Sequence, residues 1–202
     1  MRTKTEEKRQ AILDVAAATF GELGFERTSM SEICSRLGGS KATIYNYFPS
    51  KEALFLEVMF QASEADFQNT MQALQAEGQD LTTTLRTFGN RFLTLLYTPE
   101  VTAVRRLLVA EGGRSQVGAR CYAQGPCRGK ALVGAFLEQA MARGQLRTAS
   151  TVLAARHLHA LLEAELLERF MFQHLPPPTP SELTECTDRA IAAFLRLYAP
   201  EP

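Results

Sequence analysis

Little in this sequence points to a membrane protein, an exported protein or a β protein. It contains no run of about eighteen apolar residues that could span a bilayer, and its N-terminus lacks the charged-then-apolar pattern of an export signal. No alternating pattern of strands is present, and glycine and proline are sparse inside most segments. With 202 residues, 46% of them hydrophobic, the chain can bury a sizeable core. We therefore expect an all-α protein that stays in the cytoplasm.

The residue sets that catalysis and metal binding require are also missing. The chain contains four cysteines, Cys34, Cys121, Cys127 and Cys186. They lack the spacing of zinc ligands, and in the cytosol they should be reduced. His159 and Glu163 are four residues apart on one helix face, but no second cluster supplies the rest of a metal site. No nucleophile with a base and no pair of catalytic carboxylates has a recognisable spacing. We expect no catalytic residue, no metal and no cofactor, hence a protein that is not an enzyme.

The overall charge gives no early sign of nucleic-acid binding. Lysine and arginine total 22, aspartate and glutamate total 22, and the sequence pI is about 6.8. Residues 1–52 hold eight basic and seven acidic residues, a net charge of +1. Binding to DNA would therefore depend on gathering the basic groups on one face and on doubling the contacts through a dimer.

Residues 28–52 have the pattern of two short helices joined by a glycine turn. Ser29 can cap the first helix, and Glu32 can return a bond to the Ser29 amide, which makes a capping box. Glycine tolerates the positive backbone torsions that end a helix, so Gly38–Gly39 predicts the turn. Ser40 then caps the second helix. This layout is that of a helix-turn-helix, whose second helix can enter the major groove of DNA.

The pattern extends over roughly the first sixty residues. Its positions are Ile12, Ala16, Phe20, Gly24, Phe25, Thr28, Ile33, Gly38, Ser40, Lys41, Ile44, Tyr45, Tyr47, Phe48, Ser50, Lys51 and Glu52. These residues resemble the DNA-binding domain of the TetR (tetracycline-repressor) family of bacterial transcription regulators. One departure concerns the turn, where the family usually has Ala-Gly-Val and this chain has Leu37, Gly38 and Gly39. We expect a looser turn as a result.

The resemblance implies a double-stranded DNA operator as partner and assigns residues to it. Phosphates would be contacted by Thr28, Ser29, Tyr47 and Lys51. Base edges would face Lys41, Ala42, Thr43, Tyr45 and Asn46, and Ser40 joins the set as the cap of their helix. Other interpretations stay open: Tyr45 and Tyr47 could pack the core, Thr43 could be solvated, and Lys51 could cover apolar surface with its stem.

Amphipathic periodicity predicts helices along the whole chain. They cover residues 5–23, 50–74, 81–97, 101–110, 128–143, 150–172 and 182–198. Glycine and proline predict a break over 112–126. The helix at 50–74 crosses from the DNA-binding domain, residues 1–52 with its motif at about 29–48, to a larger helical effector-binding and dimerisation domain, residues 53–202. A shift at the far end of this helix would move the DNA-binding domain as a rigid body.

The last two expected helices are candidates for a homodimer interface. The apolar residues of 150–172 cover more than one stripe, so one face of a single helix cannot hold them all. Pairing with 182–198 and the same two helices of a second copy would bury both stripes. The residues assigned to this interface are Leu158, Leu162, Leu166, Phe170, Ile191, Phe194, Leu195 and Tyr198. The alternative is that one chain satisfies both stripes by itself.

The resemblance also implies that the helical domain binds a small effector. Side chains that could form a largely apolar site with a few polar groups are Phe67, Phe88, Phe92, Tyr97, Tyr122, Phe136, Met141, His159 and Glu163. The alternative for each of them is an ordinary core position. The basic residues between 105 and 130 leave an anionic effector open, with a solvated basic face as the default.

These expectations define a function. We predict a ligand-responsive transcription repressor that binds a palindromic operator as a homodimer and is released by a small molecule. A transcription activator would have the same DNA-binding domain, so the sequence does not separate the two. A thiol-based redox regulator is a further alternative, in which Arg120 and Arg128 lower the pKa of Cys121 and Cys127.

Overall fold

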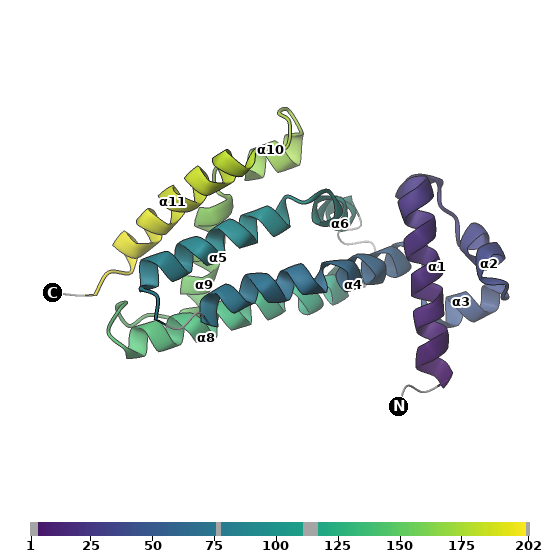
Figure 1. The fold of residues 1–202 in the computed structure, drawn as a ribbon, viewed down its shortest axis with the longest axis horizontal. Coiled ribbons are helices and arrows are strands. Elements are labelled where there is room, and N and C mark those ends of the chain that lie inside the picture. The colour runs from purple at the N-terminus through teal and green to yellow at the C-terminus, as the bar shows by residue number, and fades with distance from the viewer. Residues whose placement is uncertain (1–3, 76–77, 111–116, 201–202) are drawn as a thin grey trace. The chain divides into compact units, whose positions relative to one another are not determined.

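The computed structural model describes residues 4–75, 78–110 and 117–200, and every regular element in them is a helix (Figure 1). The predicted all-α fold is therefore confirmed. None of the described helices is long and apolar enough to cross a membrane. The chain divides into two compact units: unit 1 is Met1–Ser63 with Val104–Ala119, and unit 2 is Glu64–Ala103 with Arg120–Pro202. The helix α4 (Lys51–Gln72) contributes residues to both units.

Unit 1 is built on the apolar stripe of α1 (Lys4–Arg27), which packs with α2 (Met30–Leu37), α3 (Lys41–Tyr47) and the start of α4. Its buried side chains include Ile12, Ala16, Phe20, Ile33, Ile44, Phe48, Leu54 and Phe55. The rings of Phe20 and Phe55 meet edge to face at 5.1 Å, and an ion pair of 2.6 Å joins Arg9 to Glu57. These contacts hold α1 against the start of α4. The helix α6 (Pro99–Ala110) is divided between the two units.

Unit 2 is a helical bundle around α5 (Leu81–Leu96). The other members are the short helix η1 (Ala73–Gln75), the part of α7 (Val117–Tyr122) from Arg120 onward, the π-helix η2 (Ala123–Cys127), α8 (Arg128–Ala142), α9 (Thr151–Glu163), α10 (Leu167–Phe172) and α11 (Pro180–Leu197). In the middle of α5, Gly89 is in contact with both α9 and α11. A Cβ atom there would lie 2.9 Å from Leu162 Cδ2 and 2.9 Å from Thr187 Cγ2. The absence of a side chain thus permits three helices to pack closely.

Two predicted segments differ from the structure. The expected helix at 150–172 is interrupted between Glu163 and Leu167, giving α9 and α10. The expected break at 112–126 is in part helical, because α7 and η2 lead directly into α8. Pro126 lies inside η2, a wide-turn helix that accommodates a residue without an N–H. Residues 111–116 lie outside the described part of the chain.

The residues predicted for the dimer interface need correction. Seven of the eight, Leu158, Leu162, Leu166, Phe170, Ile191, Phe194 and Tyr198, are buried within one chain, and Leu195 is partly buried against the same core. These seven side chains have 8% or less of their surface exposed and so have little to present to a second copy, whereas Leu195 retains an exposed part. The exposed apolar side chains of this region are Val152, Leu153, Leu167, Met171, Phe172, Leu175 and Leu197.

Polar bonds fix the C-terminal end of α11. The backbone N–H of Arg147 donates to the Tyr198 carbonyl (3.0 Å), and its Nε donates to the Leu197 carbonyl (3.0 Å). The Arg147 guanidinium also lies over the Tyr198 ring at 5.0 Å, and the Tyr198 hydroxyl bonds to His157 Nδ1 at 2.7 Å. Carbonyls that usually lack partners at a helix end are therefore satisfied here.

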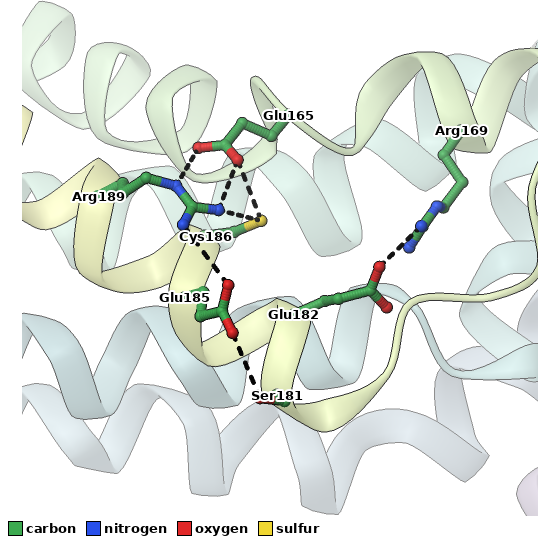
Figure 2. Close-up of polar contacts among 7 residues, drawn as sticks. All are labelled: Glu165, Arg169, Ser181, Glu182, Glu185, Cys186 and Arg189. Carbon is green, nitrogen blue, oxygen red and sulfur yellow. Dashed lines mark hydrogen bonds and ion pairs between the residues drawn. The ribbon is translucent and has the colours of Figure 1, made fainter.

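The start and the middle of α11 are held by charged groups (Figure 2). Arg189 makes a bidentate pair with Glu165, at 2.9 and 2.7 Å, and Arg169 donates to Glu182 at 2.9 Å. Glu182 also closes a capping box with Thr179 at the start of the helix. The Arg169 bond and the two Thr179 bonds lower the pKa of Glu182 from 4.5 to about 2. These bonds join the α9–α10 turn and α10 to α11.

Candidate functional site

The helix-turn-helix predicted for residues 28–52 is present, and its caps are those expected. Ser29 Oγ accepts from the Glu32 amide at 3.1 Å, and Ser40 Oγ accepts from the Thr43 amide at 3.2 Å. Gly38 has φ 70°, the left-handed conformation that favours glycine, and ends α2. The second half of the capping box is absent at Ser29, because the Glu32 carboxylate accepts from Arg36 Nε at 2.8 Å instead.

The turn between α2 and α3 carries a bond that was not predicted. The buried thiol of Cys34 donates to the Gly39 carbonyl at 2.8 Å. The looser turn expected from two consecutive glycines is thus held by a side chain of the preceding helix. No local signal in the sequence marks Cys34 for this contact.

One face of α3 is buried and the opposite face is exposed. Ile44 is fully buried and anchors the helix to unit 1. Exposed positions are Lys41, Ala42, Tyr45 and Asn46, and Thr43 and Tyr47 are half-buried. Ser29 and Ser40 are also exposed beside their helix N-termini. A short helix with this free face and two nearby helix N-termini can place side chains in a groove and amides against phosphates.

Two of the predicted phosphate contacts are engaged within the protein. Thr28 is 2% exposed, and its hydroxyl donates to the Gly24 carbonyl at 2.7 Å, so its assignment to phosphate is corrected to a structural role. Lys51 Nζ donates to the Phe25 carbonyl at 2.9 Å and lies 4.2 Å from the centre of the Phe25 ring. This lysine holds the start of α4 against the end of α1.

In unit 2, four of the side chains predicted to bind an effector, Phe88, Phe92, Tyr122 and His159, lie near one another and near the basic residue Lys130. Phe92 stacks on Phe88 at 5.8 Å and meets the His159 ring edge to face at 4.9 Å. Lys130 Nζ lies 5.3 Å from the centre of the Tyr122 ring, and its positive charge lowers the pKa of His159. We call Phe92, Tyr122, Lys130 and His159 the aromatic–basic cluster. Its members come from α5, α7, α8 and α9.

Phe67, on α4, packs against the start of α8. The Arg128 guanidinium covers the Phe67 ring at 4.6 Å and makes a bidentate pair with Glu64 at 3.0 and 2.9 Å. A Cβ atom at Gly129 would lie 3.5 Å from the Phe67 ring. These contacts attach α4 to the start of α8, and they use the charge of Arg128 within the chain.

The remaining predicted ligand residues are less suited to contact a small molecule. Phe88 is fully buried in the core, whereas Tyr97, Phe136 and Met141 are partly buried and pack against it. Glu163 is half-buried on the same helix as His159. Phe88 is therefore an ordinary core residue, and the sequence pattern did not distinguish it from Phe92, which lies one helical turn further along α5.

His159 has the most perturbed environment in the cluster. Its Nδ1 bonds to the Ala155 carbonyl at 2.7 Å. Burial lowers the pKa of His159 below 6.5, and the nearby Lys130 charge lowers it further, against the opposing effect of the Ala155 bond. The imidazole is therefore neutral at physiological pH.

A polar groove that the sequence did not predict lies between α4, α5 and α11. It has a volume of about 840 Å³, and its lining includes Asn69, Asn90, Thr94, Thr184 and Asp188. None of the nine predicted ligand residues lines it. Threonine and asparagine on the exposed side of an amphipathic helix are typical of a solvated face, so the sequence carries no signal for the groove.

Cys121 does not have the properties that a thiol switch requires. All four cysteines are free thiols. Cys121 is buried, whereas Cys127 is exposed. Burial raises the pKa of Cys121 to about 11, the opposite of the expected effect of its arginine neighbours. Of the two arginines named in the prediction, Arg128 is paired with Glu64. A protonated, buried thiol is a poor redox sensor.

Comparison with known proteins matches both parts of the chain to one family. Residues 83–200 match the family described as "AefR-like transcriptional repressor, C-terminal domain". Residues 12–58 match "Bacterial regulatory proteins, tetR family". The first match alone covers more than half of the 202 residues.

Similar proteins have been found over the whole chain and over its first part. A putative TetR-family transcriptional regulator from Mesorhizobium loti MAFF303099 is 28% identical, with a TM-score of 0.80, over 98% of this chain and 99% of that one. The flavonoid-responsive regulator FrrA is 30% identical, with a TM-score of 0.71, over 97% and 99%. The HTH-type transcriptional regulator RutR of Escherichia coli (strain K12) is 44% identical over 54 residues, which span 27% of this chain and 26% of RutR.

Proposed function

Because the chain belongs to the TetR family of bacterial transcriptional regulators, we propose that it is a repressor that binds a palindromic operator as a homodimer and leaves it when a small molecule binds. Regulators of this family bind DNA and function as dimers with small-molecule effectors, and they are not enzymes. The observation that carries the proposal is the exposed face of α3, with Lys41, Ala42, Tyr45 and Asn46 beside two capped helix N-termini.

The proposed homodimer uses the exposed apolar side chains of α9 to α11. Phe172 is 71% exposed and Val152 is 61% exposed, which is costly for large apolar groups in a single chain. A second copy would cover them, and the resulting two-fold axis would relate two α3 helices to two operator half-sites. The variant Phe172→Glu should lower the dimer content in analytical ultracentrifugation, whereas Leu132→Glu on α8 should not.

Release requires that the effector distinguish two conformations. Changing the occupied fraction of operator from 99% to 1% needs about 5.5 kcal/mol of differential affinity between those conformations. The helix α4 belongs to both units, and in unit 2 the Arg128 bonds to Glu64 and the Arg128–Phe67 contact attach it to α8. An effector that displaces α8 would thereby move α4.

An aromatic effector fits the aromatic–basic cluster. Phe92 and Tyr122 offer flat apolar surfaces, and Lys130 and His159 offer polar groups beside them. The similarity to FrrA, a regulator named for its response to flavonoids, supports this class of compound. A redox mechanism receives no support, because burial raises the pKa of Cys121.

Selection of binding sites from a random duplex library tests the DNA-binding part of the proposal. The wild-type chain should enrich a palindrome, and Lys41→Ala and Tyr45→Ala should each lose about 1–3 kcal/mol of affinity for it, the usual value of a good base contact. The control is Arg143→Ala in unit 2, which removes a positive charge from an exposed position. General binding that depends on salt, with no enriched palindrome, would contradict the proposal.

A further inference from the structure

The two ring nitrogens of His159 have different hydrogen-bonding roles. A carbonyl oxygen can only accept, so the 2.7 Å contact between His159 Nδ1 and the Ala155 carbonyl requires a proton on Nδ1. In the neutral imidazole, Nε2 then carries a lone pair and is an acceptor. No hydrogen bond to Nε2 is found among the described residues, and His159 is partly buried. A ligand donor can therefore bind at this nitrogen.

Lys130 supplies the complementary group. Its ammonium lies within electrostatic range of His159 and over the Tyr122 ring, and it has no ion-pair partner in the part of the chain that the structure describes. An ammonium has only donors to offer. A strong donor at Lys130 thus lies near a histidine with an unused acceptor, whose ring the Phe92 ring meets at 84°.

A hydroxyl group satisfies both partners at once. Its proton can be donated to Nε2 while its oxygen accepts from the ammonium. A methyl ether retains the acceptor and loses the donor, which leaves Nε2 unpaired. A carboxylate turns lone pairs towards the lone pair of Nε2, and the positive charge of Lys130 opposes the protonation of His159 that would remove this repulsion.

We propose that the effector carries a phenolic hydroxyl, which donates to His159 Nε2 and accepts from Lys130 while its ring packs against Phe92 and Tyr122. This inference rests on the proposed effector-binding function of unit 2, and it names the chemical group that the site recognises. Phenols suit the site better than aliphatic alcohols because the neighbouring side chains are aromatic and the phenolic O–H is the more acidic donor.

Three matched probes test the hydroxyl. We would measure the binding of naphthol, its methyl ether and naphthoate to the full-length chain by calorimetry at neutral pH, where the first two are uncharged. Naphthol should bind about fivefold or more tightly than the ether, since a lost hydrogen bond to a group left unpaired costs about 1–3 kcal/mol. Naphthoate should bind more weakly than naphthol. Failure of naphthol to bind, or equal affinity for naphthol and the ether, would overturn the inference.

Two substitutions assign the preference to its residues. His159→Phe preserves an aromatic ring without Nε2, and Lys130→Met preserves the stem without the charge, so each should remove most of the preference for naphthol over the ether. Arg156→Met, which removes a charge from an exposed position of α9, should leave it unchanged. If His159→Phe does not fold, His159→Gln retains an acceptor and should retain part of the preference. An unchanged preference in Lys130→Met would contradict the assignment.

A separate measurement distinguishes this inference from the proposed function. The selected operator would be titrated with and without saturating naphthol. A naphthol preference that depends on His159 and Lys130 supports the recognition of a hydroxyl whether or not the operator is released. Release by naphthol that the two substitutions leave unaltered would overturn the role of these residues while supporting the effector-responsive function.

Discussion

Replacing Gly89 by alanine should destabilise the protein, although glycine is a poor residue for the middle of a helix. In an open helical position the change gains about 1 kcal/mol, because alanine has the higher helix propensity. At Gly89 the new methyl group would lie 2.9 Å from Leu162 Cδ2 and 2.9 Å from Thr187 Cγ2. Leu162 is fully buried, and Thr187 is β-branched and 1% exposed, so neither has free space into which to move.

The balance of these effects sets the expected magnitude. Overpacking of a dense core costs about 1–3 kcal/mol, which exceeds the gain in propensity. We expect a net loss of about 1 kcal/mol and a fall in Tm of about 2–4 °C for a chain of this size. The matched control is Gly134→Ala on α8, where the nearest atom to a new Cβ is the Thr151 carbonyl oxygen at 3.8 Å. This control should raise Tm.

Thermal unfolding followed by circular dichroism compares the two variants under one set of conditions. Shifts of opposite sign would show that close packing of α5 against α9 and α11 determines the effect at Gly89. The reasoning is refuted if Gly89→Ala raises Tm as much as Gly134→Ala does, because that would mean that Leu162 and Thr187 relax without cost.

Three further predictions concern single groups. With a thiol reagent at neutral pH, Cys127 should react quickly and Cys34, Cys121 and Cys186 only on unfolding, since these three are buried; rapid modification of two thiols would revive the redox alternative. Because the pKa of Glu182 falls from 4.5 to about 2 on folding, its contribution to stability is present above pH 4.5 and is lost as the pH falls towards 2. Glu182→Gln should therefore lower Tm at neutral pH and weaken the dependence of Tm on acid pH, whereas the control Glu168→Gln should not. Thr28→Val should lower Tm through loss of the bond to the Gly24 carbonyl and leave the operator affinity of the folded protein unchanged; a selective loss of affinity would restore the phosphate contact.

The parts of the fold that were predictable are those encoded by short-range patterns. Ser29, Ser40 and Gly38 act within a few residues of themselves, so the helix-turn-helix could be located from its caps. The expected helices at 81–97 and 128–143 agree with α5 and α8 to within a residue at most ends, because each has one apolar face.

The sequence-based predictions failed where contacts between residues far apart in the sequence determine the structure. Residues 164–166 are good helix formers, so nothing local predicts the interruption between α9 and α10. With this interruption between them, Leu158 and Phe170 are both buried within one chain. The assignment of these side chains to a dimer interface depended on one continuous helix. For the same reason, the sequence did not indicate that Thr28 and Lys51 are engaged with carbonyls of α1.

The bonds at the end of α11 have a consequence for the dynamics of the chain. The last turn of a helix ordinarily frays, and its amide protons exchange with solvent through local opening that costs little free energy. Here the Tyr198 amide donates to Phe194, and the Leu197 and Tyr198 carbonyls accept from Arg147, which precedes α9. Opening this turn therefore breaks contacts that are fifty residues apart in the sequence. Amide protons at the end of α11 should exchange as slowly as those at its centre, and a protease should find no early entry there.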